Sequence, residues 1–149
     1  MPETSAGEEL LRLENQICFP LYACAKEIVR QYRKPLEPLE LTYTQYLVMM
    51  VLWEFGTMTE GELGKKLRLD SGTLAPLLKR LEKQGLIDRL RSADDERRLL
   101  VQLTQKGEAL RRKALGVPEA MKGCLRMPQE ELEQLRELLN KALCSMETR

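Results

Sequence analysis

Four cysteines, Cys18, Cys24, Cys124 and Cys144, carry the most reactive side chains of this 149-residue chain, which contains no histidine. The absence of histidine excludes Ser-His and Cys-His nucleophilic pairs and most mixed-ligand zinc or iron sites. No two cysteines form a CxxC pair, so the sequence predicts neither a zinc ribbon nor a thioredoxin-like motif. We therefore expect no metal and no cofactor, and we expect any disulfide to act as a signal in a reducing compartment.

Cys18 is the cysteine best placed for redox chemistry. Pro20 is tolerated within the first turn of a helix, so a helix boundary is predicted near residues 15–20, with Cys18 in the first turn. The positive end of the helix dipole favours the thiolate, which a peroxide oxidises to sulfenic acid. The same half of the chain contains four tyrosines, whose hydroxyls can donate hydrogen bonds to a thiolate: Tyr22, Tyr32, Tyr43 and Tyr46. From the residues alone, however, inert core packing is the commoner role of such a cysteine.

The charge of the chain is concentrated in one region. The net charge is only +1, yet residues 65–113 contain 14 Lys and Arg against 7 Asp and Glu, a balance of +7 that leaves −6 for the remainder. This distribution is typical of a basic working region in a near-neutral protein, although a solvated helix face would look similar.

Composition and the N-terminal sequence bear on the compartment. The composition, with 43% hydrophobic and 32% charged residues, predicts a folded globular domain. No apolar run approaches the ~18–20 residues of a membrane span. The acidic N-terminus, MPETSAGEELLRLEN, lacks the basic and apolar regions of a secretion signal. We therefore expect a cytoplasmic protein that does not bind a membrane.

Two short helices, predicted at about 60–67 and 71–84, have the spacing of a helix–turn–helix. The second begins with small or hydroxyl-bearing residues, so its N-terminus can approach a phosphate or a base edge. The residues of this helix predicted to contact DNA are Ser71, Gly72, Thr73, Lys79 and Arg80. Its predicted inner face carries Leu74, Leu77, Leu78 and Leu81. An ordinary packing helix would show the same pattern on its own.

Two alternating segments follow, at 86–91 and 98–103, and predict a β-ribbon joined by the charged turn SADDER. We predict that the tip presents Arg97 and Arg98, and that Asp95 holds an arginine by a bidentate pair. A helix in the major groove and a basic ribbon tip in the neighbouring minor groove would together contact duplex DNA. This order of elements favours DNA binding over a merely solvated turn.

Further helices are predicted on both sides of this middle segment. Their expected ranges are about 15–33, 43–55, 104–115 and 128–145, and the third is interrupted at Pro118 before it resumes towards Leu125. Pro35 and Pro38 are expected to mark a linker. Capping boxes are predicted for Thr42 with Gln45 and for Thr59 with Glu62, while Asp70 or Ser71 and Thr104 are predicted as single caps.

Several phrases of the sequence resemble the MarR-family winged-helix repressors: LTYTQYLVMMVLWE, LDSGTLAPLLKRLEKQGLI and DDERRLLVQLT. ENQICFPLYA followed by QYRKPL resembles the organic-hydroperoxide-sensing branch, the OhrR type. The resemblance implies a mainly α fold with a small β-ribbon in one MarR-type domain, 1–149. It implies a winged helix–turn–helix at 41–103 with its wing at about 86–103, and dimerisation helices at 8–40 and 104–147. The expected partners are a second copy of the chain and a pseudo-palindromic operator in double-stranded DNA.

The same resemblance implies a redox site. The sensing cysteine of the branch falls on Cys18, and the two tyrosines that hydrogen-bond to it across the dimer fall on Tyr32 and Tyr43. In the two-cysteine subclass a C-terminal cysteine of the partner resolves the sulfenic acid, and Cys124, beside Gly123, is the candidate. The other subclass forms a mixed disulfide with a small thiol.

The function implied is a repressor, not an enzyme, that leaves its operator when an organic hydroperoxide oxidises Cys18. Cys24 and Cys144 are expected to be structural, and Pro20 departs from the small or aliphatic residue that the branch usually has there. Four alternatives stay open: a repressor controlled by a small ligand, a regulator of broader oxidative stress, a thiol peroxidase that uses Cys18, and a helical interaction module without a DNA role.

Overall fold

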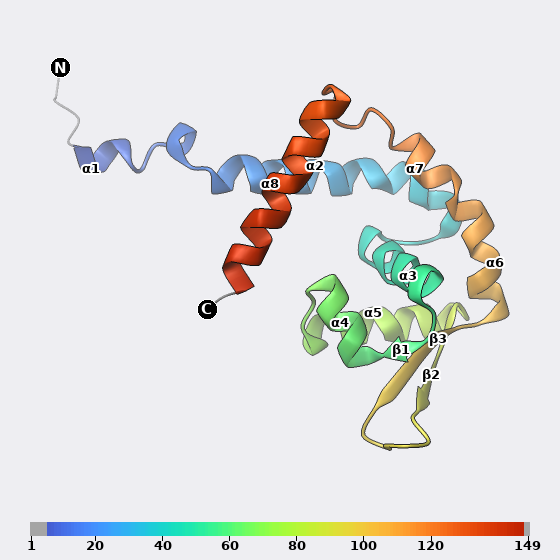
Figure 1. Cartoon of the computed structure of the whole chain (residues 1–149). Helices are drawn as coiled ribbons and strands as arrows, with labels where there is room; N and C mark the ends of the chain where they lie inside the picture. The colour runs from blue at the N-terminus through green and yellow to red at the C-terminus, as the bar shows by residue number, and fades with distance from the viewer. Residues whose placement is uncertain (1–5, 148–149) are drawn as a thin grey trace.

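The computed structural model describes residues 6–147, in which two helical arms extend from a lobe of helices and a small sheet (Figure 1). In chain order the elements are α1 (Ala6–Glu9), η1 (Leu13–Asn15), α2 (Cys18–Leu36), η2 (Glu37–Leu39), α3 (Tyr43–Phe55), β1 (Met58–Thr59), α4 (Glu60–Leu67), α5 (Ser71–Lys83), β2 (Ile87–Arg91), β3 (Leu99–Leu103), α6 (Gln105–Ala114), α7 (Gly116–Ala120) and α8 (Gln129–Glu147). This order confirms the predicted mainly helical fold with a small β-ribbon. Residues 1–5 and 148–149 of the predicted single domain lie outside the described range.

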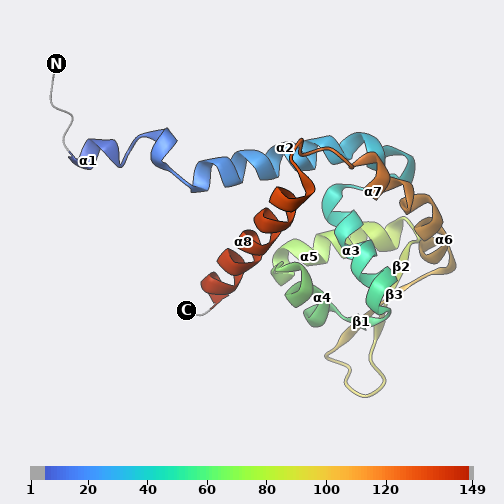
Figure 2. The same cartoon turned by 45° about the horizontal axis from the view of Figure 1, so that its top comes forward.

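The lobe consists of α3, α4 and α5 packed against an antiparallel sheet with the strand order β1-β3-β2 (Figure 2). Val101 of the central strand lies opposite Met58 on one side and Arg89 on the other. The four leucines predicted for the inner face of α5 are all buried. Strand β1 was not predicted, because two residues are too few to show an alternating pattern.

Side-chain caps set the starts of the lobe helices, as the sequence predicts. Both capping boxes form, Thr42 with Gln45 at α3 and Thr59 with Glu62 at α4. Asp70 caps α5, and the Thr104 hydroxyl accepts the N–H of Gly107 at 3.0 Å to cap α6. Each cap satisfies a backbone donor that the first turn of a helix leaves unpaired.

Helix α2 is longer at its C-terminal end than predicted. It continues to Leu36, so Pro35 lies in its last turn and not in a linker. The burial of Leu36 in the core holds this end in place, and hydrogen bonding resumes after the proline because the Glu37 N–H reaches the carbonyls of the previous turn. At the other end the helix begins at Cys18, while Asn15 closes η1. Pro38 lies in η2, another helical turn.

The segment before α8 also differs from the prediction. Helices α6 and α7 are separate, and the chain does not remain helical to Leu125 after Ala120. Gly123 has a left-handed φ of 76°, so Cys124 lies in the irregular connection between α7 and α8 and not in a helix. The last helix begins after Pro128, at Gln129.

The lobe is joined to α6 through a close approach of two backbone segments. A Cβ atom on Gly107 would lie 2.0 Å from the carbonyl oxygen of Leu86, so only glycine fits there. The Trp53 indole N–H of α3 donates to the Gly107 carbonyl at 3.0 Å, and the Lys106 ammonium donates to the Gln84 carbonyl at 2.8 Å. These contacts connect α3 and the end of α5 directly to α6.

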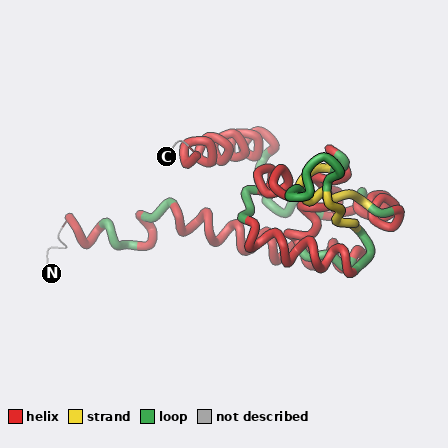
Figure 3. Tube along the Cα trace, turned by 90° about the horizontal axis from the view of Figure 1, so that it is seen from below, coloured by secondary structure: helices red, strands yellow, loops and turns green. Residues whose placement is uncertain are grey.

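The arms expose apolar surface that has no cover within the described chain. The N-terminal arm, which consists of α1, η1 and the first part of α2, and the second arm, α8, are two separate extensions (Figure 3). The most exposed large apolar side chains on them include Leu10, Leu11, Ile17, Tyr22 and Leu138. None of the residues of α8 is buried, although it carries a leucine stripe. No helix among residues 6–147 is both long and apolar enough to cross a membrane.

Candidate nucleic-acid interface and redox site

The first turn of α5 is open to solvent, as DNA contact requires. All five residues of α5 predicted to contact DNA are exposed: Ser71, Gly72, Thr73, Lys79 and Arg80. The Asp70 carboxylate accepts the Thr73 N–H at 2.7 Å, and this hydrogen bond holds the pKa of Asp70 below its usual value. The helix start is therefore fixed by a cap that stays ionised at neutral pH.

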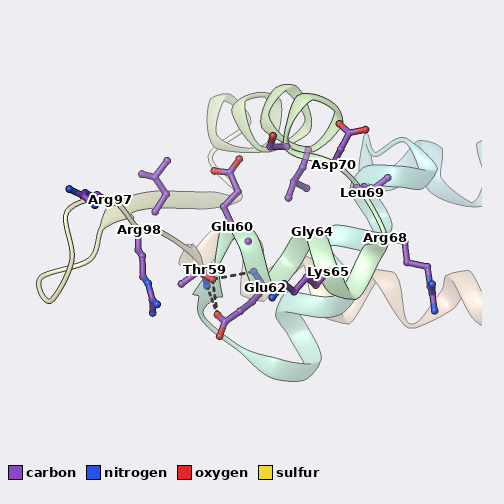
Figure 4. A pocket seen from close by; sticks show the side chains of 14 residues that line it. Thr59, Glu60, Glu62, Gly64, Lys65, Arg68, Leu69, Asp70, Arg97 and Arg98 are labelled. Carbon is purple, nitrogen blue, oxygen red and sulfur yellow. Dashed lines mark hydrogen bonds between the residues drawn. The ribbon is translucent and has the colours of Figure 1, made fainter. Parts of the chain in front are cut away.

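A groove separates the start of α5 and helix α4 from the ribbon (Figure 4). Its charged lining residues are the basic Lys65, Arg68, Arg97 and Arg98 and the acidic Glu60, Glu62 and Asp70. Arg68 also forms an ion pair with Glu147 of α8. The two arginines of the turn were predicted as DNA contacts, whereas Lys65 and Arg68 of the helix–turn–helix were not. Their only signal was membership of the basic region 65–113. Helix α5 and the arginines of the wing thus border one groove, which four basic and three acidic side chains line.

The turn of the wing is built differently from the prediction. Asp95 does not form a bidentate pair: its carboxylate accepts the backbone N–H of Arg97 at 3.0 Å, and the Arg98 Nε lies 3.9 Å from it. An aspartate readily hydrogen-bonds the backbone two residues on, which uses its oxygen locally to close the turn. Figure 4 shows the two arginine side chains pointing in different directions. The hydrogen bonds of Thr59 and the charge of Arg98 keep the pKa of Glu62 low, which places Arg98 towards α4.

Cys18 is the first residue of α2 and is exposed, so the predicted first-turn position is confirmed. Ile17 provides no side-chain cap. Tyr32 lies 14 residues later in the same helix, which at 1.5 Å per residue separates them by about 21 Å. Figure 1 shows that the Cys18 end of α2 extends away from the lobe. Within one chain, therefore, the structure does not bring Cys18 to Tyr32.

Three tyrosines form a cluster where α2 meets α3. The ring centroid of Tyr32 lies 4.5 Å from that of Tyr43 and 6.0 Å from that of Tyr46. Burial raises the pKa of all three hydroxyls. They therefore keep their protons at neutral pH and are available as hydrogen-bond donors.

Cys124 lies close to this cluster. It is half-buried against the core, and it contributes with the other two tyrosines to the raised pKa of Tyr32, after burial. The structure thus brings together Cys124 and Tyr32, which are 92 positions apart, but not Cys124 and Cys18. Cys24 and Cys144 are exposed on α2 and α8, so neither contributes to the core of the single chain. Among residues 6–147 no group of three or more Cys, Asp or Glu side chains could hold a metal ion.

Comparison with known proteins gives one consistent result. Residues 41–99 match the model of the MarR family. The chain is 47% identical over 129 residues to the organic hydroperoxide resistance transcriptional regulator of Bacillus subtilis, covering 87% of this chain and 88% of that protein. Reduced AbfR bound to DNA, a Staphylococcus epidermidis protein, is similar with a TM-score of 0.76 at 36% identity, covering 94% of this chain and 98% of AbfR. Disulfide-formed AbfR has a TM-score of 0.63 at 35% identity, covering 99% and 100% of the two chains.

Proposed function

Because this chain belongs to the MarR family, we propose that it is a cytoplasmic homodimeric repressor that leaves a pseudo-palindromic operator when an organic hydroperoxide oxidises Cys18. The relatives named above are transcriptional regulators and not enzymes, so the thiol peroxidase alternative is set aside. One observation carries the redox part of the proposal. Cys18 is exposed about 21 Å along α2 from Tyr32, so only a second chain can bring a Cys18 thiol to the tyrosine cluster.

The DNA part of the proposal rests on the groove that the start of α5 shares with the arginines of the turn. The open start of α5 fits a major groove, and the arginines of the turn fit the adjacent minor groove. A dimer would present two such lobes, and half-sites about 34–36 Å apart would match them. Operator binding then depends on the separation of the lobes, because both must dock together.

The dimer would form through the arms. The apolar side chains of the N-terminal arm and of α8 remain exposed in one chain, and a large exposed apolar surface is typical of a protein–protein contact. Association of two arms would cover it. It would also place Cys18 of one subunit near the tyrosine cluster of the other.

The proposed chemistry has two steps. The Cys18 thiolate attacks the outer oxygen of the hydroperoxide, the O–O bond breaks, the alcohol leaves after taking a proton, and sulfenic acid remains. The thiol of the partner subunit's Cys124 then attacks that sulfur, forming a disulfide and releasing water. The tyrosine hydroxyls, protonated at neutral pH, would stabilise the thiolate before the first step. Tyr32 and Tyr43 are the proposed donors.

The position of Cys124 supports the two-cysteine route. It packs against the same core cluster as Tyr32, towards which the sulfur from the other chain would come, and it lies in an irregular segment next to Gly123. Such a segment can move without breaking a helix. Disulfide formation would pull on the connection to α8 and shift the lobes apart.

Binding to DNA before and after oxidation tests the proposal. We expect the reduced protein to enrich a pseudo-palindromic sequence from random duplexes, to lose affinity for it after one equivalent of cumene hydroperoxide per subunit, and to regain it with dithiothreitol. Equal affinity of the reduced and oxidised forms would overturn redox control. Release of the reduced protein by an added small aromatic acid under nitrogen would instead support the small-ligand alternative.

We expect Cys124→Ser to abolish the covalent dimer that hydroperoxide produces in the wild type, because no second thiol reaches the Cys18 sulfenic acid. Non-reducing electrophoresis measures the dimer, and dimedone labelling measures the sulfenic acid that then persists. Cys24→Ser is the matched control and should still give the covalent dimer. A covalent dimer in Cys124→Ser would remove Cys124 from the resolving role.

A further inference from the structure

A half-buried ion pair connects the last turn of α5 with strand β2. Arg89 donates from Nε and Nη2 to one carboxylate oxygen of Glu82, at 3.1 and 2.9 Å. The Arg89 side chain is 23% exposed, whereas Arg98 is 70% exposed in its 3.9 Å contact with Asp95. The Glu82–Arg89 pair is therefore the shorter and better shielded of these two contacts in the winged segment.

The pleat of β2 explains why Arg89 points towards the helix. Alternate residues of a strand share one face, and Ile87 on this face is fully buried. Arg91, the next residue on the same face, donates from Nη1 to the Glu96 carbonyl across the turn at 3.3 Å. Two arginines of the ribbon are thus occupied within the protein. The arginines of the turn are the ones that border the groove.

The position of β2 in the sheet makes this pair important for geometry. β2 is an outer strand, and no other strand of residues 6–147 pairs with its far edge. The last ladder pair is Arg91 with Leu99, and the turn beyond it follows the direction of the ribbon. A bond from α5 to the middle of β2 therefore constrains the angle between the two parts that border the groove.

We propose that Glu82 and Arg89 are positioning residues for DNA recognition. Their ion pair sets the angle at which the wing leaves α5, so that Arg97 reaches the minor groove while α5 occupies the major groove. Arg89 then holds the wing in position and does not bind a DNA phosphate. This inference rests on the proposed function, because it takes duplex DNA as the ligand.

Coupling between Arg89 and Arg97 tests the inference on the full-length reduced protein. The probes are the duplex enriched by the wild type and a shuffled duplex of the same composition. We expect Arg97→Ala to reduce affinity for the enriched duplex about tenfold in the wild type, but less than about threefold in Arg89→Met, where the wing is already misplaced. Glu82→Gln, which keeps the size of the side chain, should reduce the effect of Arg97→Ala in the same way.

The salt dependence of DNA binding distinguishes a positioning role of Arg89 from a direct contact with phosphate. Loss of a phosphate contact would lower the slope of log K against log salt by about 0.9 on both duplexes. We expect Arg89→Met to leave that slope unchanged and to weaken binding only to the enriched duplex. The exchange variant Glu82→Arg with Arg89→Glu should restore affinity to within about threefold of wild type, because it re-forms the ion pair.

Three results would overturn the inference: an equal loss from Arg97→Ala in every background, a lowered salt slope in Arg89→Met, or failed restoration in an exchange variant that melts like the wild type. If one of these results is found while the wild type still prefers the enriched duplex, the proposed function stands. A wild type that enriches no sequence would overturn the proposed function and this inference with it.

Discussion

The Cys18→Ser protein should remain on its operator after addition of an organic hydroperoxide, while the wild type loses about 100-fold in affinity, near the upper end of typical coupling between two sites. Serine nearly matches cysteine in size, so the reduced dimer is preserved, but its hydroxyl cannot form a sulfenic acid or a disulfide. Fluorescence anisotropy of a labelled operator duplex, before and after one equivalent of oxidant, measures both affinities.

Cys24→Ser is the matched control for this experiment, because Cys24 is also an exposed thiol of α2. It should respond to the oxidant like the wild type. Release of Cys18→Ser from the operator by the same oxidant would show that another group senses it.

Gly107→Ala should destabilise the protein by about 3 kcal/mol or more, because its new methyl group would overlap a backbone atom. A Cβ there would lie 2.0 Å from the Leu86 carbonyl oxygen and 3.0 Å from its carbon. Backbone cannot swing aside as a flexible side chain can. For a chain of this size the melting temperature should fall by roughly 6–12 °C.

Gly61→Ala provides the control, since a Cβ at Gly61 of α4 meets nothing nearer than 4.0 Å. In a helix alanine is favoured over glycine by roughly 0.5–1 kcal/mol, so this variant should melt at or slightly above the wild-type temperature. Thermal unfolding without DNA, followed by circular dichroism, compares the two. Equal melting temperatures would contradict the close approach of α6 and Leu86.

Local signals in the sequence were enough for most of the lobe. The caps at Thr42, Thr59, Asp70 and Thr104 form as predicted, because each depends on residues within three positions of one another. The buried face of α5 was likewise predicted from its 3.6-residue period. These features need no information from distant parts of the chain.

Features that depend on tertiary contacts were missed. The continuation of α2 past Pro35 follows from the burial of Leu36, which no local rule for proline contains. The partner of Arg89 is seven positions away in another element, so the pattern of the ribbon does not reveal it. For Asp95, two local options competed, and the backbone N–H of Arg97 was the nearer donor.

Only part of the redox site could likewise be predicted from local signals in the sequence. The position of Cys18 in a first turn was readable from Pro20 and the apolar pattern that follows. The proximity of Cys124 to Tyr32, across 92 positions, has no signature in spacing or composition. The resemblance to the peroxide-sensing branch pointed to Cys124 as the candidate resolving cysteine, and that role stays a prediction.

Trp53 is the sole indole of the chain, and its N–H is bonded to Gly107 where the lobe joins α6. Indole emission changes in wavelength and intensity when such a bond lengthens or water enters. The intrinsic tryptophan fluorescence of the unlabelled protein should therefore report whether the lobe rotates relative to α6 during oxidation or moves with α6 as a rigid body. An unchanged emission spectrum would show that the contact between Trp53 and Gly107 is kept, and that the movement occurs further along the chain, nearer to α7.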